Sequence, residues 1–327
     1  MRKRDILWKA GATLAVGIGA TAVSAERARR HHPPTGRFLD VDGVSLHFVE
    51  RGSGPPVVLL HGNGSMIADF VSSGLVDKLA ASRRVIVFDR PGYGHSSRPR
   101  GRAFTPVAQA DLFAEAVRRL GAEPAHVLGH SWGALVAAEW GLRHPETVSG
   151  LTLVAGFFFP VPRADVLFAS APAAPVLGSL ARRTVLPPLG RLTWGALLGR
   201  IFGPNPVPEH WREGFPREMA LTPRALRASA EETAAMIPAA RRAQDRYGTL
   251  RPPLTIVAGK ADRMVATSQQ SERLHEAVAG SRLVLLPGVG HMVHHVDPDA
   301  VAEAVDAARP RDATGAAAPR LRIVGAP

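Results

Sequence analysis

The segment 124–140, PAHVLGHSWGALVAAEW, constrains the fold of this chain more than any other stretch. Residues 125–129 form a short apolar run that is typical of a buried strand, whereas residues 134–140 are good helix formers. Between them lies the pentapeptide GHSWG at 129–133, with the pattern Gly-x-Ser-x-Gly. In a tight strand-to-helix turn such a serine is held clear of the sheet, and the helix N-terminus faces any negative charge that develops beside it. Ser131 is therefore a candidate nucleophile, although a glycine-rich turn with a surface serine has the same pattern.

Strand-like and helix-like stretches alternate on both sides of this segment. Residues 38–41 and 44–50 alternate in polarity around Asp42-Gly43, a strong hairpin signal. Further apolar strands are predicted at 57–60, 84–88, 151–154, 254–258 and 282–286, and helices at 66–81, 106–120, 267–279 and 298–308. Glycine-rich loops follow the strands. The pattern predicts an α/β fold with a mostly parallel sheet, helices on both faces, and ligands bound at the carboxyl ends of the strands.

Residues 157–251 interrupt this alternation. They are rich in proline, contain no clear strand, and have amphipathic stretches at 175–183, 192–202 and 223–246. We interpret them as a helical lid over the sheet edge. The predicted organisation is an N-terminal membrane anchor or signal segment at 1–30, a linker at 31–36, a core at 37–156 and 252–308, the lid at 157–251, and a disordered tail at 309–327.

The N-terminal segment has the layout of a targeting sequence. Basic residues at 2–4 precede an uncharged run at 10–25, and three arginines follow within 27–30. We expect residues 1–30 to lie outside the folded body as an uncleaved membrane anchor of marginal spanning length. Cleavage near Ala25 followed by export is the second alternative, and a plain cytosolic tail is the third.

Composition narrows the function classes. The chain has no cysteine, which excludes disulfides, thiolate metal sites and cysteine nucleophiles. Its net charge of +12 is not accompanied by a nucleic-acid-binding motif, and two tyrosines offer little base stacking. We therefore expect a small-molecule substrate and no nucleic-acid partner, and the oligomeric state stays open.

A serine nucleophile needs a base, a group that orients the base, and donors for the oxyanion. His291 follows the strand 282–286 through a glycine-rich loop, and it is our candidate base, with His294 as the reserve. Asp262 follows the strand 254–258 and is the candidate orienting acid, whereas a turn-capping aspartate is the alternative. The strand at 151–154 ends without a carboxylate.

The oxyanion donors are expected to be backbone N–H groups. Trp132 stands at the start of the predicted helix, and Asn63 lies in the loop after the strand 57–60. His61 and His130 flank glycine-rich turns, where a histidine more often braces the backbone. No metal or cofactor is predicted.

The order Ser131, Asp262, His291, together with HGNG at 61–64 and DRPGYG at 89–94, resembles the α/β-hydrolase superfamily. The resemblance implies an eight-stranded sheet whose second strand is antiparallel, a lid, and no cofactor. The similarity is greatest to the lid-bearing branch of haloalkane dehalogenases, epoxide hydrolases and cofactor-free haloperoxidases.

Serine at position 131 argues against dehalogenation. Members of that branch that act on halides or epoxides have an aspartate there, and an alkyl-aspartate is hydrolysed at its own carbonyl, whereas an alkyl-serine ether is not. We expect acyl transfer instead, by a carboxylesterase acting on a small or medium apolar ester. A perhydrolase, an acyltransferase and a C–C bond hydrolase use the same triad, and a catalytically silent ligand-binding protein is the alternative from another class.

Two features of the expected pocket stay open. In the dehalogenase-like branch the indole of Trp132 and the side chain of Asn63 would both face the substrate; here they either pack and brace the loop or supply extra donors. Several lid aromatics are expected to form the lid core and some to wall an apolar pocket above Ser131: Phe157, Phe158, Phe159, Phe168, Trp194, Phe202 and Trp211.

Overall fold

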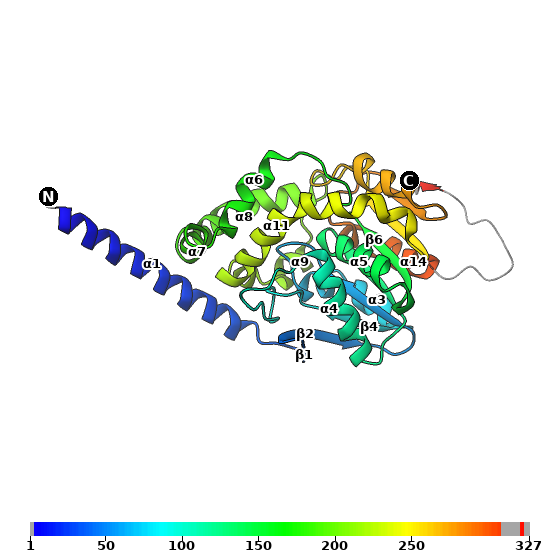
Figure 1. Ribbon diagram of the computed structural model, residues 1–327, viewed down its shortest axis with the longest axis horizontal. Coiled ribbons are helices and arrows are strands. Elements are labelled where there is room, and N and C mark those ends of the chain that lie inside the picture. Colours follow the sequence, from blue (N-terminus) through cyan, green and yellow to red (C-terminus); the bar gives the residue numbers. More distant parts are fainter. Residues whose placement is uncertain (1–2, 309–320, 324–327) are drawn as a thin grey trace.

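The computed structural model describes residues 3–308 and 321–323 (Figure 1). A single sheet runs through the molecule in the order β1-β2-β4-β3-β5-β6-β7-β8-β9. Its strands are β1 (Arg37–Val41), β2 (Val44–Arg51), β3 (Pro56–Leu60), β4 (Arg84–Phe88), β5 (Ala125–His130), β6 (Val148–Val154), β7 (Leu254–Gly259), β8 (Arg282–Leu286) and β9 (Leu321–Ile323). Strand β2 is antiparallel to both of its neighbours and the other pairs are parallel. The predicted α/β-hydrolase fold is confirmed.

The ninth strand differs from the prediction. Residues 321–323 pair with β8 in parallel, although they fall in the tail that the sequence led us to expect as disordered. That expectation is wrong for these three residues, because a sheet edge offers them hydrogen-bond partners that composition does not reveal. Residues 309–320 and 324–327, the rest of the predicted tail, lie outside the described residues.

Helices cover both faces of the sheet. The core helices are α2 (Ile67–Ser72), α3 (Leu75–Ala80), α4 (Pro106–Arg119), α5 (Trp132–Arg143), α12 (Arg273–Ala277), α13 (Val293–Val296) and α14 (Pro298–Ala307). Alternate residues of strands β2 to β8 enter opposite hydrophobic clusters, as a pleated strand requires. In β3, for example, Val58 and Leu60 pack with α4 and α5, whereas Val57 and Leu59 pack with α2, α3 and α14.

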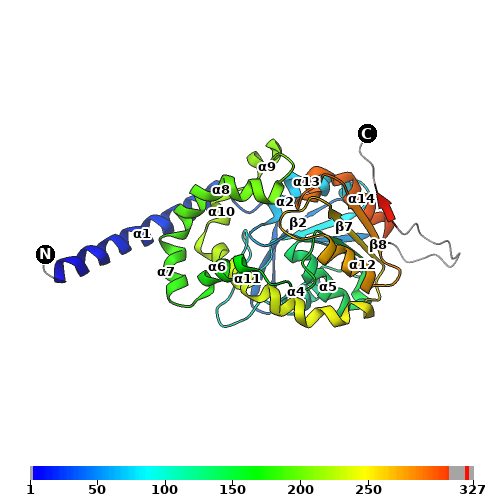
Figure 2. The same cartoon turned by 90° about the horizontal axis from the view of Figure 1, so that it is seen from above.

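Helices alone fill the chain between β6 and β7. They are α6 (Ala164–Ser170), α7 (Leu177–Arg183), α8 (Leu186–Phe202), α9 (Glu209–Gly214), α10 (Arg217–Ala220) and α11 (Pro223–Ala243). Helices α6, α7 and α8 lie at one end of the molecule, near the long helix α1 (Lys3–His31), whereas α11 runs back along the core and packs Ala239 and Ala243 into it (Figures 1 and 2). We refer to α6–α11 as the lid.

Helix α1 does not lie outside the folded body, as we had expected of residues 1–30. Its C-terminal half packs on the lid through the buried side chains of Thr21, Ala25 and Ala28. Arg191 of α8 also donates a hydrogen bond of 2.6 Å to the Ser24 hydroxyl. These residues are small, so the sequence pattern gave no amphipathic signal for the contact. No helix in the described part of the chain combines the length and the apolar character needed to cross a bilayer.

Candidate active site

Ser131 occupies the turn between β5 and α5. Its backbone has φ 54° and ψ −115°, a conformation that L-residues rarely adopt, and its N–H donates to the carbonyl of Val154 at 2.9 Å. The two glycines of the motif make this turn possible. A Cβ on Gly129 would overlap the carbonyl oxygen of Gly133, and a Cβ on Gly133 would overlap that of Leu60. The pentapeptide thus dictates the strained turn that presents the serine.

Asp262 and His291 come together at the same sheet edge. His291 Nδ1 lies 2.7 Å from Asp262 Oδ2, and both side chains are almost fully buried. The other carboxylate oxygen, Oδ1, accepts hydrogen bonds from the N–H groups of Met264 (2.7 Å) and Val265 (2.9 Å). The carboxylate is therefore fixed in orientation, and its bond to Nδ1 leaves Nε2 of His291 free to act as a base.

The other candidate histidines have different partners. His294, the reserve base, is bonded through Nε2 to Asp69 Oδ2 at 3.2 Å. His61 bonds to the Gly62 carbonyl at 2.8 Å and accepts from the Arg90 N–H at 3.0 Å, while His130 bonds to the His291 carbonyl at 3.1 Å. Burial, with a smaller contribution from Arg90, lowers the pKa of His61 to about 3, so this ring is neutral. These histidines brace the backbone around the site.

A cavity of about 390 Å³ lies between the sheet edge and the lid. Ser131, His291, Asn63 and Trp132 all line it. Of the aromatics expected to wall it, Phe157, Trp194 and Trp211 do so. Phe158, Phe159 and Phe202 are buried in hydrophobic clusters, and Phe168 is exposed. The size suits a small or medium ligand, and the lining is mostly apolar.

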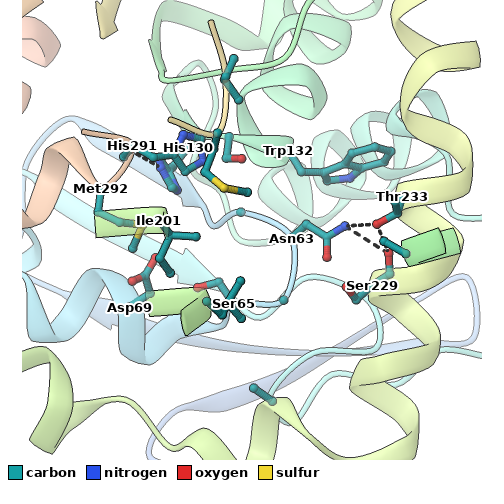
Figure 3. A pocket seen from close by; sticks show the side chains of 18 of the residues that line it. Asn63, Ser65, Asp69, His130, Trp132, Ile201, Ser229, Thr233, His291 and Met292 are labelled. Carbon is teal, nitrogen blue, oxygen red and sulfur yellow. Dashed lines mark hydrogen bonds between the residues drawn. The ribbon is translucent and has the colours of Figure 1, made fainter. Parts of the chain in front are cut away.

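The side chains of Asn63 and Trp132 differ in their hydrogen bonding (Figure 3). Asn63 Nδ2 donates to the Ser229 carbonyl (3.1 Å) and to Thr233 Oγ1 (3.2 Å), both on α11. This side chain therefore ties its loop to the lid. The indole Nε1 of Trp132 is buried and has no hydrogen-bond partner within the described chain, although the residue lines the cavity.

The two residues expected to supply the oxyanion donors line the cavity together with Ser131. Trp132 is the first residue of α5, and the first N–H groups of a helix have no partner within it. Asn63 follows Gly62 in the loop after β3, and a Cβ on Gly62 would lie 3.2 Å from Ser131 Cβ, so this loop passes directly beside the serine.

Sequence reasoning missed a buried ionic network under this loop. Arg90 forms a fully buried salt bridge with Glu232 of α11. Its guanidinium also donates to the carbonyls of His61 (2.7 Å) and Gly62 (2.9 Å). Glu232 accepts further bonds from Tyr93 (2.8 Å) and Gln109 (3.0 Å). The network holds the HGNG loop against the lid, and no local motif signals it, because its two charges are far apart in the sequence.

A second buried cluster lies beside His291. His295 Nε2 bonds to Asp69 Oδ1 at 2.9 Å, and Trp211 of α9 donates to the same oxygen at 3.1 Å. Burial alone would raise the pKa of Asp69, but its contacts with His294 and His295 outweigh burial and hold that pKa well below its usual range. Asp69, His294 and His295 are the group of described residues whose ligand atoms lie close enough together, within 4.8 Å, to hold a metal ion. In this structure the Asp69 carboxylate bonds to both imidazoles, and the bond from Trp211 fastens α9 to the core, while His294 Nδ1 is buried without a partner among the described residues.

The chain is similar in sequence and in structure to α/β hydrolases. A family model described as alpha/beta hydrolase fold matches residues 55–298. The chain is 30% identical over 281 residues to Rv2715, an uncharacterized protein of Mycobacterium tuberculosis, covering 81% of this chain and 78% of the relative. It is 26% identical over 284 residues to haloalkane dehalogenase 2 of the same organism, covering 84% and 94%. Among solved structures, a hydrolase from Pseudomonas aeruginosa PA01 is similar, with a TM-score of 0.68, 25% identity, and 84% and 98% of the two chains covered.

Proposed function

Because the chain belongs to the α/β-hydrolase family, we propose that it is a serine hydrolase that works through an acyl-enzyme, and specifically a carboxylesterase. The observation that carries the proposal is the Asp262–His291 bond of 2.7 Å at the cavity whose lining includes Ser131 in its strained turn. A serine, rather than a carboxylate, at this position favours substrates with an acyl carbon.

In the proposed reaction, His291 takes the proton from the Ser131 hydroxyl as Oγ attacks the ester carbonyl. Asp262 holds the imidazole in the tautomer with the proton on Nδ1 and stabilises the imidazolium that forms. The N–H groups of Asn63 and Trp132 stabilise the oxyanion, and loss of one such donor costs about 3–4 kcal/mol in comparable sites. The alcohol leaves with the proton from His291, and water then releases the acid by the reverse sequence of proton transfers.

The cavity supports a small or medium apolar acyl group as the substrate class. Its volume of about 390 Å³ falls within the range of small-molecule sites, and it lies under apolar lid side chains such as Leu198 and Ile201. The substrate itself is not specified by any motif of the lid.

The test is labelling with a fluorophosphonate, followed by a nitrophenyl ester series of increasing acyl length. We expect labelling of the wild type, none of Ser131→Ala, and a fall in kcat/KM beyond medium chains. Labelling that persists in Ser131→Ala would refute the assignment of the nucleophile. No labelling and no turnover, with a ligand still bound, would instead favour the silent binding protein. Faster turnover when hydrogen peroxide is added would indicate a perhydrolase, and faster turnover with an alcohol or amine acceptor would indicate an acyltransferase. Cleavage of a vinylogous diketone faster than of the esters would indicate a C–C bond hydrolase.

We also propose that residues 1–30 bring the protein to a membrane. The support is the uncharged run at 10–25 between basic clusters. N-terminal sequencing of the mature protein, together with cell fractionation, tests this. A mature chain that begins near Glu26 and is found outside the membrane fraction would establish cleavage and export instead.

A further inference from the structure

The exposed large apolar side chains are concentrated at one end of the molecule. Twelve are exposed among the described residues, and eleven of these belong to α1 or to residues 168–197 of the lid. The exception is Phe38 on β1. We call these eleven side chains the lid face: Leu14, Val16, Val23, Phe168, Val176, Leu177, Leu180, Val185, Leu189, Leu192 and Leu197.

The elements that carry the lid face are neighbours. Helix α1 contacts α7, and α7 contacts α8. Both views show α1, α7 and α8 at the end of the molecule away from α14 (Figures 1 and 2). Phe168, Leu177 and Leu192 are between 76% and 83% exposed, so these side chains have hardly any contact with the protein. Scattered apolar side chains are ordinary on a soluble surface, but a concentration of this kind marks an interaction site.

One of these helices, α8, also forms a wall of the cavity at Ser131. Trp194, Leu198 and Ile201 of α8 line it from the inner side. Leu197 lines the cavity and is 44% exposed, so this side chain belongs both to the cavity wall and to the lid face. An apolar substrate that leaves an apolar phase at this end therefore has a path into the cavity beside Leu197, along apolar side chains.

The charge on these elements is one-sided. Helix α1 has six basic and two acidic residues, and residues 157–202 have five arginines and one aspartate. Together they account for eight of the twelve net positive charges of the chain. Apolar side chains flanked by basic ones fit a surface with apolar interior and anionic headgroups. A second copy of this chain fits less well, because the two basic ends would face each other.

We propose that the lid face docks the protein on a bilayer that contains anionic lipid, with α1 lying along its surface, and that an ester dissolved in the bilayer enters the cavity beside Leu197. The docking follows from the exposed side chains and the charge alone; the entry of an ester rests on the proposed function. In this arrangement α1 acts together with the lid to which it is packed and is not a separate tether.

The experiment uses the full chain and vesicle flotation, with vesicles of pure phosphatidylcholine or of phosphatidylcholine mixed with phosphatidylglycerol. The test variant carries Phe168→Ser, Leu177→Ser and Leu192→Ser, three exposed positions outside the cavity lining. The matched control is Phe38→Ser, which replaces an exposed apolar residue of the edge strand β1, outside the lid face. We expect wild type and control to float with the phosphatidylglycerol vesicles, and the triple variant to lose at least about tenfold of its partitioning.

Hydrolysis separates this proposal from the proposed function. The triple variant should retain wild-type turnover of a water-soluble nitrophenyl ester and lose about tenfold on an ester embedded in vesicles. A chain that floats with vesicles but hydrolyses neither ester would refute the esterase and keep the docking surface. A chain that hydrolyses the soluble ester but does not float would refute the docking surface. A wild type that is dimeric without lipid and does not float, with a monomeric triple variant, would assign the lid face to a second copy and overturn the proposal.

Discussion

Glu232→Gln tests the buried network that joins the lid to the HGNG loop. The side chains of Arg90 and Glu232 are both 0% exposed, and the glutamate accepts bonds from Arg90, Tyr93 and Gln109. The amide removes the negative charge and turns one acceptor into a donor that faces other donors. The Arg90 cation is then left buried without its counter-ion. Breaking a pair of this kind by neutralising one partner costs about 3–5 kcal/mol of unfolding free energy.

The neighbouring residue provides a matched control. Glu231 lies on the same helix and pairs with Arg98 and Arg227, but its side chain is 29% exposed. Glu231→Gln makes the same chemical change on a partly exposed carboxylate. Its partner Arg98 is almost fully buried but also donates to the Pro91 carbonyl (2.9 Å), so the expected cost is only about 1 kcal/mol. Urea unfolding of both variants, followed by circular dichroism, gives the two free energies.

The network should also affect catalysis. Arg90 holds the carbonyls of His61 and Gly62, which immediately precede Asn63, a proposed oxyanion donor. We therefore expect Glu232→Gln to lower kcat more than it raises KM, whereas Glu231→Gln leaves both unchanged. Equal unfolding free energies for the two variants would refute the reasoning, because the buried and the partly exposed ion pair would then contribute equally to stability.

Three further predictions concern the site and its surroundings. Asp262→Asn should lower kcat by about 10⁴-fold. The amide carbonyl is expected to keep the hydrogen bonds from the N–H groups of Met264 and Val265, so the amide NH₂ would face His291 and favour the wrong tautomer. Near-normal rates would mean that another carboxylate orients the base. Trp132→Phe removes a buried N–H donor that has no partner in the described chain, so the unfolding free energy should stay unchanged or rise. If the indole donates to the substrate, the variant should lose about 1–3 kcal/mol in kcat/KM. Unchanged kinetics over several esters would leave the indole a packing role. Burial lowers the pKa of His61 and of His126 to about 3. Between that value and the unfolded value of 6.5 the unfolded chain binds more protons than the folded chain, so the unfolding free energy decreases as the pH is lowered. Each histidine contributes a slope of up to about 1.4 kcal/mol per pH unit, and an unfolding free energy that is flat from pH 7 to pH 5 would contradict this.

The α/β-hydrolase fold was predictable because its signals are local. Apolar runs with glycine-rich ends identify parallel strands, and the Gly-x-Ser-x-Gly pattern identifies the turn at Ser131. Since the carboxyl ends of parallel strands meet at one edge, the same reasoning placed Asp262 and His291 near one another, and the structure brings them to 2.7 Å.

The supporting interactions could not be predicted in this way. The Arg90–Glu232 pair joins residues 142 positions apart, and the Asp69–His294 pair joins residues 225 apart. A single charged or histidine residue in a sequence carries no information about so distant a partner. Helix α1 buries small side chains such as Ala25 and Ala28 on the lid, and alanines do not produce the apolar periodicity that would predict a packed helix face. The short strand at 321–323 is likewise formed by backbone pairing with β8, which amino-acid composition does not predict.

The central claim is that Ser131 forms an acyl-enzyme, and peptide mass spectrometry after a rapid acid quench tests it most directly. The protein is mixed with a nitrophenyl ester, quenched and digested, and each peptide is searched for the mass of the acyl group. We predict an acyl adduct on Ser131 within the GHSWG segment, no adduct in Ser131→Ala, and a fall in kcat of about 10⁶-fold in that variant with its fold intact. An adduct on another residue, or turnover that survives in Ser131→Ala, would contradict the claim.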